Sequence, residues 1–329
     1  MKRSPEFIYI AFVLLVAIAA GVTTRFMAWS FDALGCAQHR APGTFMAYCG
    51  STQYGDYEHG GFYFGLESEA IANLKRAKVL FLGSSLTQVA FSTDEVNSYF
   101  RARHVPYYVM GFGYDERFDF ALALIEKYQL KPDAIVINAD PFFRGNTTRF
   151  AGELLTKTTD IPTAIGQILA LTNSLEKKLF SLIRWQICRF RSLCNLKHLA
   201  IYRDNTNGAW IWRDLYTSDE YGHLAVDLAR RQVEELPKPE DLVKARRLIE
   251  VTRVLPGCVI LTAIPNSIID AEAFVTDLAS ALDAKVMLPQ IDDLYTWDHS
   301  HFTWSSAQRW SARFLGEAES TLQRCTKIR

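Results

Sequence analysis

Four short apolar runs constrain this 329-residue chain to an α/β fold. Each run is nearly continuous, ends at a glycine, a proline or a polar side chain, and is separated from the next by a segment with helical spacing. Continuous apolar strands are typical of parallel sheets covered on both faces. Their alternation with helices predicts a doubly wound parallel sheet. The predicted strands are residues 78–82, 106–110, 133–138 and 257–264, with a short fifth strand at 285–288.

The segments between these strands have the apolar spacing of helices. Residues 117–128 place Phe118 and Ile125 on one helical face. Thr93 begins a predicted helix at 93–104 as its N-cap, because acidic residues follow it in the first turn. The other predicted helices cover residues 67–76, 161–188, 239–254, 271–282 and 304–324.

The alternation is interrupted by a helical insertion between the third and fourth strands, at about residues 142–237. A long helix there precedes a polar and aromatic loop at 202–212, and we interpret the insertion as a lid or a partner-binding face. Residues 78–329 are therefore predicted to form one α/β domain. A segment rich in glycine and tyrosine precedes it at 25–77, and we interpret His59 within that segment as structural.

The N-terminal segment has the features of a membrane anchor. Lys2 and Arg3 precede an uncharged run at residues 7–24, which is about the minimum length for a membrane-spanning helix. The basic tail at 1–6 should stay in the cytoplasm, which places the rest of the chain on the periplasmic side of the inner membrane. The alternative is a signal peptide cleaved near Ala17-Ile18-Ala19. Both interpretations place the bulk of the protein outside the cytoplasm.

Six cysteines suit an oxidising, extracytoplasmic compartment. The predicted disulfides are Cys36–Cys49, Cys188–Cys194 and Cys258–Cys325, although spacing alone cannot choose among the possible pairings. No repeated Cys-x-x-Cys pattern is present, which argues against a structural zinc site. The 36 basic and 36 acidic side chains balance, which argues against nucleic acid as a partner.

Two short segments far apart in the sequence carry side chains suited to nucleophilic catalysis. In the first, Gly-Ser-Ser ends a predicted strand and presents Ser85. In the second, Asp298 and His301 are three residues apart, so one turn of chain can bring carboxylate and imidazole together. Together they can supply a nucleophile, a general base and the group that orients it. Two alternatives stay open: Ser85 as a helix N-cap, and Asp298, His299 and His301 as metal ligands.

Further candidates follow the carboxyl ends of predicted strands, where the active groups of doubly wound sheets gather. Gly111 and Gly113 lie after the second strand. Asn138 and Asp140 lie after the third.

These motifs, in this order, resemble the SGNH, or GDSL-type, hydrolase superfamily over about residues 78–315. The resemblance implies that Ser85 is the nucleophile, His301 the base and Asp298 its partner. It also implies an oxyanion donor after the second strand. That donor is Gly113, or alternatively Gly111.

This sequence departs from the third motif of the family, which is usually Gly-x-Asn-Asp. Here the strand ends Asn138-Ala139-Asp140, so Asn138 and Asp140 are only possible substitutes. With its predicted anchor, the chain resembles membrane-anchored branches of this superfamily, such as the alginate O-acetylation proteins and the teichoic-acid D-alanyl-transfer protein.

The resemblance and the predicted topology together imply a membrane-anchored serine enzyme that adds or removes O-acyl groups, with acetyl the expected group, on a cell-envelope glycan. It would be an esterase if water is the acceptor and an O-acyltransferase if a sugar hydroxyl is. The implied partners are the glycan and an acyl donor, or a membrane protein that supplies it. No cofactor and no metal is implied. The alternative, suggested by the atypical third motif, is a catalytically degenerate relative that binds glycan or supports a complex.

Overall fold

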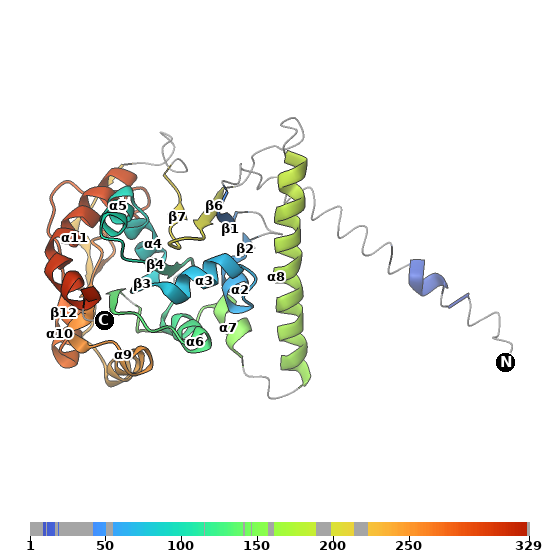
Figure 1. Ribbon diagram of the computed structural model, residues 1–329, viewed down its shortest axis with the longest axis horizontal. Helices are drawn as coiled ribbons and strands as arrows, with labels where there is room; N and C mark the ends of the chain where they lie inside the picture. The colour runs from blue at the N-terminus through green and yellow to red at the C-terminus, as the bar shows by residue number, and fades with distance from the viewer. Residues whose placement is uncertain are drawn as a thin grey trace.

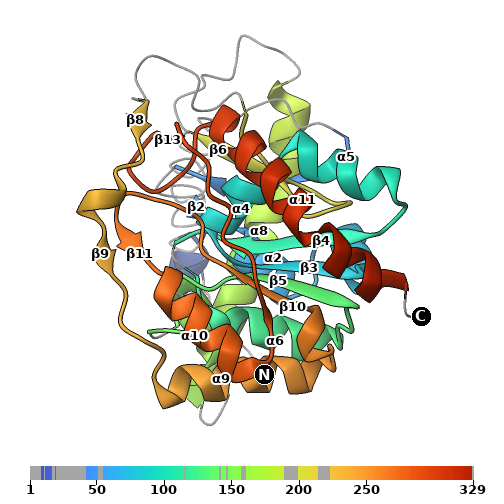
Figure 2. The same cartoon turned by 90° about the vertical axis from the view of Figure 1, so that its left-hand side faces the viewer.

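A five-stranded parallel sheet lies at the centre of the protein (Figures 1 and 2). The structure is a computed structural model that describes residues 9–10, 12–16, 19, 42–50, 55–114, 116–140, 142–145, 147–156, 161–188, 199–213 and 223–327. The strands of the sheet are β3 (Val79–Ser84), β4 (Tyr107–Phe112), β5 (Ala134–Asn138), β10 (Val259–Thr262) and β12 (Lys285–Val286). The predicted α/β class with a parallel sheet is confirmed.

The chain enters this sheet in its interior and then builds outward in both directions. The strand order is β12-β10-β5-β3-β4, so β3 pairs with β4 on one side and with β5 on the other. Every residue of these three strands is buried, as their continuous apolar sequence predicts. The connection after β3 leads to β4 on one side of the sheet, whereas the connection after β5 leads to β10 on the other side. In open α/β sheets, ligands bind at the carboxyl ends of the two strands where the connections diverge in this way.

Helices cover both faces of the sheet (Figure 2). One layer contains α4 (Ser85–Phe91), α5 (Asp94–Ala102) and α11 (Trp304–Lys327). The other contains α6 (Phe118–Tyr128), α9 (Pro239–Thr252) and α10 (Glu272–Leu282). Thr93 caps α5 as predicted, because its Oγ1 accepts the backbone N–H of Val96 at 3.3 Å.

A second sheet of four strands joins segments that lie about 150 residues apart. β1 (Thr44–Cys49) pairs antiparallel with β6 (Ala200–Asp204), and the order is β2-β1-β6-β7. β2 is Gly55–Asp56 and β7 is Trp210–Ile211. The prediction of a loop at 202–212 is therefore wrong, because β6, β7 and the turn between them form a β-hairpin. Its polarity was misleading because Arg203 is fully buried.

The remaining elements surround these two sheets. α2 (Glu58–Tyr63), α3 (Ser68–Arg76) and α7 (Arg149–Leu155) precede α8 (Ile161–Cys188), which has the predicted bounds and stands upright beside the second sheet (Figure 1). Two short pairs of strands complete the fold: β8 (Leu224–Ala225) with β13 (Tyr295–Thr296), and β9 (Gln232–Val233) with β11 (Ile269–Asp270). Short 3₁₀ helices lie at Leu228–Arg230 (η2) and Pro256–Cys258 (η3).

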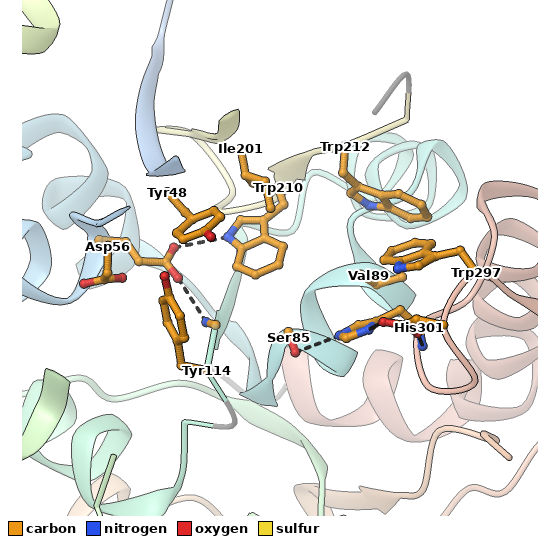
Figure 3. A pocket seen from close by; sticks show the side chains of 13 residues that line it. Tyr48, Asp56, Ser85, Val89, Tyr114, Ile201, Trp210, Trp212, Trp297 and His301 are labelled. Carbon is orange, nitrogen blue, oxygen red and sulfur yellow. Dashed lines mark hydrogen bonds and ion pairs between the residues drawn. The ribbon is translucent and has the colours of Figure 1, made fainter. Parts of the chain in front are cut away.

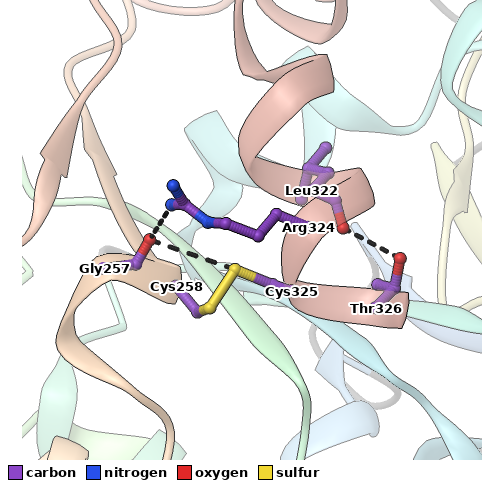
Figure 4. The surroundings of a disulfide bond; sticks show 6 residues. All are labelled: Gly257, Cys258, Leu322, Arg324, Cys325 and Thr326. Atoms are coloured by element: carbon purple, nitrogen blue, oxygen red, sulfur yellow. Dashed lines mark hydrogen bonds between the residues drawn. A yellow bond between two sulfur atoms is a disulfide. The ribbon is translucent and has the colours of Figure 1, made fainter. Parts of the chain in front are cut away.

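A disulfide between Cys258 and Cys325 ties the start of β10 to the end of α11 (Figure 4). Their Cα atoms lie 5.7 Å apart, and this predicted pair is confirmed. Cys49 is also disulfide-bonded. Cys36 and Cys194 lie outside the described residues, so the other two predicted pairs stay predictions.

Within the described part of the chain, no helix combines the length and the apolar character needed to cross a membrane. Of the anchor predicted at 7–24, the structure describes only residues 9–10, 12–16 and 19. The rest of that segment lies outside the described residues, and the anchor stays a prediction.

Candidate active site

Ser85 is the first residue of α4 and directly follows strand β3. Gly83 permits the tight turn, because its φ is +151° and a Cβ there would lie 2.0 Å from Thr87 Oγ1. The N-cap of α4 is Ser84, whose Oγ accepts the N–H of Leu86 at 3.3 Å. The alternative interpretation of Ser85 as the helix cap is therefore wrong.

The structure places Ser85, His301 and Asp298 in one line of hydrogen bonds, and Figure 3 shows the bond between Ser85 and His301. His301 Nε2 lies 2.9 Å from Ser85 Oγ, and its Nδ1 lies 2.7 Å from Asp298 Oδ2. Burial of Asp298 works against its ionisation, but hydrogen bonds from the His301 ring and from the backbone N–H groups of His301 and Ser300 hold its pKa well below the usual range. A charged Asp298 selects the tautomer in which Nδ1 donates and Nε2 accepts the serine proton.

The loop between β13 and α11 holds His301 in place. The backbone N–H of Trp297 donates to the carbonyl of His301 at 3.1 Å, and that of Thr303 donates to Tyr295 at 2.8 Å. The Trp297 ring also stacks on the imidazole, with centroids 5.2 Å apart and planes 7° from parallel. Such a flat contact limits rotation of the imidazole.

The metal alternative for Asp298, His299 and His301 is not supported. Both ring nitrogens of His301 have hydrogen-bond partners within the triad. Across the described residues, a group with metal-ligand spacing occurs at Asp56, Glu58 and His59 and not in the loop that carries His301.

Ser85 faces a pocket of about 210 Å³ whose lining includes five tyrosine and tryptophan rings (Figure 3). The rings are those of Tyr48, Tyr114, Trp210, Trp212 and Trp297. Pockets that enclose drug-sized ligands are larger, at about 300–1,000 Å³. This pocket is therefore of a size for a small ligand.

Glu58, a buried residue that sequence reasoning missed, lines the same pocket. Its Oε1 accepts the backbone N–H of Gly113 at 3.1 Å, and its Oε2 accepts the indole N–H of Trp210 at 3.1 Å. Its Oε2 also forms an ion pair of 2.9 Å with Arg203, which is fully buried. No local motif marked this pair, because Glu58 and Arg203 are brought together only by the pairing of β1 with β6.

The two predicted oxyanion glycines have different surroundings. Gly113 lines the pocket, but its N–H is engaged by Glu58. Gly111 is not among the lining residues, and its carbonyl accepts the side-chain amide of Gln88 at 2.9 Å. Of the two, only Gly113 is placed to reach a group bound at Ser85.

The possible third-motif substitutes Asn138 and Asp140 are not among the lining residues. Asn138 Oδ1 accepts the N–H of Ile264 at 3.1 Å, and Asp140 Oδ2 accepts the amide of Asn266 at 3.3 Å. Both side chains therefore join the carboxyl end of β5 to the loop after β10, which is a structural role.

Behind the pocket wall, His59 lies between two carboxylates. Its Nδ1 is 2.8 Å from Asp56 Oδ1, and its Nε2 is 3.0 Å from Glu116 Oε2. Burial works against the charge of His59, but Asp56 and Glu116 outweigh it and raise the pKa of His59 to about 10. His59 is almost fully buried and does not line the pocket, which agrees with its interpretation as structural.

Comparisons of the chain with family models, with curated proteins and with solved structures found no match. The arguments for a function therefore come from the geometry of the site and from the sequence motifs.

Proposed function

We propose that the protein is a serine acyl-enzyme catalyst that adds or removes O-acyl groups, acetyl first among them, on a cell-envelope glycan. One observation carries the proposal: Ser85 Oγ, the His301 ring and the Asp298 carboxylate form a continuous chain with distances of 2.9 and 2.7 Å. These three residues line a pocket of about 210 Å³, which is large enough for a small acyl group. The order of these residues along an α/β sheet supports the proposed likeness to SGNH hydrolases.

In the proposed first half-reaction, Ser85 Oγ attacks the carbonyl carbon of an ester while His301 Nε2 takes the hydroxyl proton. The Asp298 carboxylate keeps the proton on Nδ1 and stabilises the imidazolium. The tetrahedral intermediate collapses, the leaving alkoxide takes the proton from His301, and the acyl group stays on Ser85. In the second half-reaction, an acceptor hydroxyl gives its proton to His301 and attacks the acyl carbon. Water as acceptor gives hydrolysis, and a sugar hydroxyl gives transfer.

The developing oxyanion needs hydrogen-bond donors aimed at it. In this proposal the Gly113 N–H serves the oxyanion and is shared with Glu58, with which it now bonds at 3.1 Å. The ion pair with Arg203 offsets the charge of Glu58 beside this position.

The proposal includes an extracytoplasmic location with an N-terminal membrane anchor. The basic flank and the apolar run at 7–24 support the anchor, and the disulfide between Cys258 and Cys325 supports an oxidising compartment. An anchored enzyme would take its acyl group from a donor, or from a membrane protein that supplies it.

A second candidate function is a non-catalytic glycan-binding or scaffold protein. The observation that favours it is the engagement of the Gly113 N–H by Glu58, together with the position of Asn138 away from the pocket. Both features leave the oxyanion with fewer obvious donors.

The experiment that separates the two candidates compares the wild type with Ser85→Ala on a chromogenic acetyl ester, and searches by mass spectrometry for an acetyl adduct on Ser85. Ser320→Ala, an exposed change on α11, is the matched control. We expect turnover and the adduct in the wild type and in the control, and neither in Ser85→Ala. Equal turnover by the wild type and Ser85→Ala would exclude the acyl-enzyme mechanism.

A further inference from the structure

The charges that line the pocket are all of one sign. The acidic residues Asp56, Glu58 and Asp298 are among the lining residues, and of the described lining residues none is a lysine or an arginine. Asp298 orients His301 within the triad. The other two carboxylates therefore need a separate explanation.

The cations that pair with these two carboxylates do not line the pocket. Arg203 pairs with Glu58 at 2.9 Å and is fully buried, and His59 pairs with Asp56 at 2.8 Å and is almost fully buried. The pocket thus presents acidic residues to a bound group, while their cationic partners lie behind them. Like charges brought together at a binding surface discriminate strongly between partners.

Trp210, one of the lining residues, is held by hydrogen bonds at both its backbone nitrogen and its indole nitrogen. The backbone N–H of Trp210 donates to Gln88 Oε1 at 3.1 Å and to Ser92 Oγ at 2.9 Å, while its indole N–H donates to Glu58. The ring is therefore oriented before any ligand binds, which lowers the entropic cost of stacking against it.

We propose that the pocket holds an uncharged sugar ring, stacked on Trp210 with its hydroxyls donating to Glu58, and that it excludes uronate and phosphodiester glycans. A sugar ring has an apolar C–H face and a hydroxylated edge, which match an aromatic ring beside carboxylate acceptors. The inference rests on the proposed function, because it names the class of glycan that reaches Ser85. It also separates this site from sites that act on acidic polymers.

The test uses two matched probes, acetylated methyl glucoside and acetylated methyl glucuronide, which differ in one carboxylate. We expect kcat/KM for deacetylation to be at least tenfold higher for the glucoside. Equal values, or a preference for the glucuronide, would overturn the inference. The burst of p-nitrophenolate from p-nitrophenyl acetate reports acylation of Ser85 independently. A burst without turnover of either sugar would overturn this inference alone, whereas the absence of any burst would overturn the proposed function.

Tyr114→Arg provides a gain-of-function arm, because Tyr114 lines the pocket and is 44% exposed. A cation there should lower the glucoside-to-glucuronide ratio at least tenfold. Leu255→Arg, an exposed change beyond the amino end of β10, is the control and should leave the ratio unchanged. An unchanged ratio in Tyr114→Arg would contradict charge selection.

Trp210→Phe keeps a ring but removes the indole N–H, and Trp210→Ala removes the ring. KM for the acetylated glucoside should rise modestly in the first variant and at least tenfold in the second. Thermal melting checks that both variants are folded. An unchanged KM in a folded Trp210→Ala would rule out stacking on this ring.

Discussion

The substitution Asp298→Asn changes one element of the candidate triad and almost nothing of its shape. Asp298 Oδ1 accepts the backbone N–H groups of Ser300 and His301 at 3.0 and 2.8 Å, and an asparagine oxygen can keep both bonds. The new amide nitrogen must then face His301 Nδ1, where Oδ2 now lies at 2.7 Å. Because an amide nitrogen only donates, Nδ1 must accept, and the ring proton moves to Nε2. The imidazole then donates to Ser85 and cannot take its proton.

A base held in the wrong tautomer should reduce kcat about 10⁴-fold. At about 1.36 kcal/mol for each factor of ten, this corresponds to a loss of about 5.5 kcal/mol of transition-state stabilisation. The free energy of unfolding should change by less than about 1 kcal/mol, because the Asp298 side chain is 41% exposed and its ion pair is screened by solvent. Catalysis and stability are therefore expected to separate sharply in this variant.

The assay is stopped-flow release of p-nitrophenolate from p-nitrophenyl acetate, with urea unfolding as the check on the fold. Asp277→Asn, an exposed change of the same kind on α10, is the matched control and should retain full activity. The depressed pKa of Asp298 means that its charge persists as the pH falls through about 3.9, the usual value, and is lost only below it. A folded Asp298→Asn variant with kcat within tenfold of the wild type would refute the tautomer argument.

Three further predictions concern stability. Gly83→Ala should lower the free energy of unfolding by about 2 kcal/mol or more, because a Cβ there overlaps a side-chain oxygen at 2.0 Å. Gly316→Ala, where a Cβ meets no atom within 4 Å, should raise the free energy of unfolding by about 0.5–1 kcal/mol. Equal shifts of the two variants in urea unfolding would contradict this contrast. The pKa of His59 is raised to about 10 in the folded state, so its stabilising charge is complete below about pH 6.5 and lost as the pH rises towards 10. The wild type should therefore lose a few kcal/mol over this window relative to His59→Gln, and parallel pH curves would count against the pairing. Cys258→Ser removes the disulfide to Cys325, whose sequence separation is 67, and should lower the free energy of unfolding by about 4 kcal/mol. A reducing agent that lowers the free energy of unfolding equally in the wild type and in the variant would disprove the role of this bond.

Most of the central sheet could be predicted from sequence because its strands are buried on both faces. Burial on both faces requires continuous apolar runs, and a glycine, a proline or a polar residue ends each run within three residues of the observed strand end. The hairpin containing β6 could not be predicted in this way. Its buried Arg203 has the polarity of a surface loop, and only a partner in a distant segment makes its burial possible.

The same contrast holds for the candidate site. Ser85 and the pair Asp298 and His301 are recognisable because their chemistry requires particular residue types at fixed local positions. Glu58 and Trp210 are 152 residues apart, and nothing in either local sequence indicates that they meet. Contacts set by tertiary pairing between distant segments leave no local pattern to recognise.

The separation of Ser85 from His301 by 216 residues has a consequence for the protein during its synthesis. At roughly 5–20 residues per second, the ribosome needs about 10–40 s to add the histidine after the serine. Throughout that interval Ser85 is an ordinary alcohol, since no base is present to activate it. The loop that carries His301 then depends on α11, which is synthesised after it. In the proposed enzyme the nascent chain is therefore inactive, and reactivity begins when folding brings His301 to Ser85 rather than when the serine is synthesised.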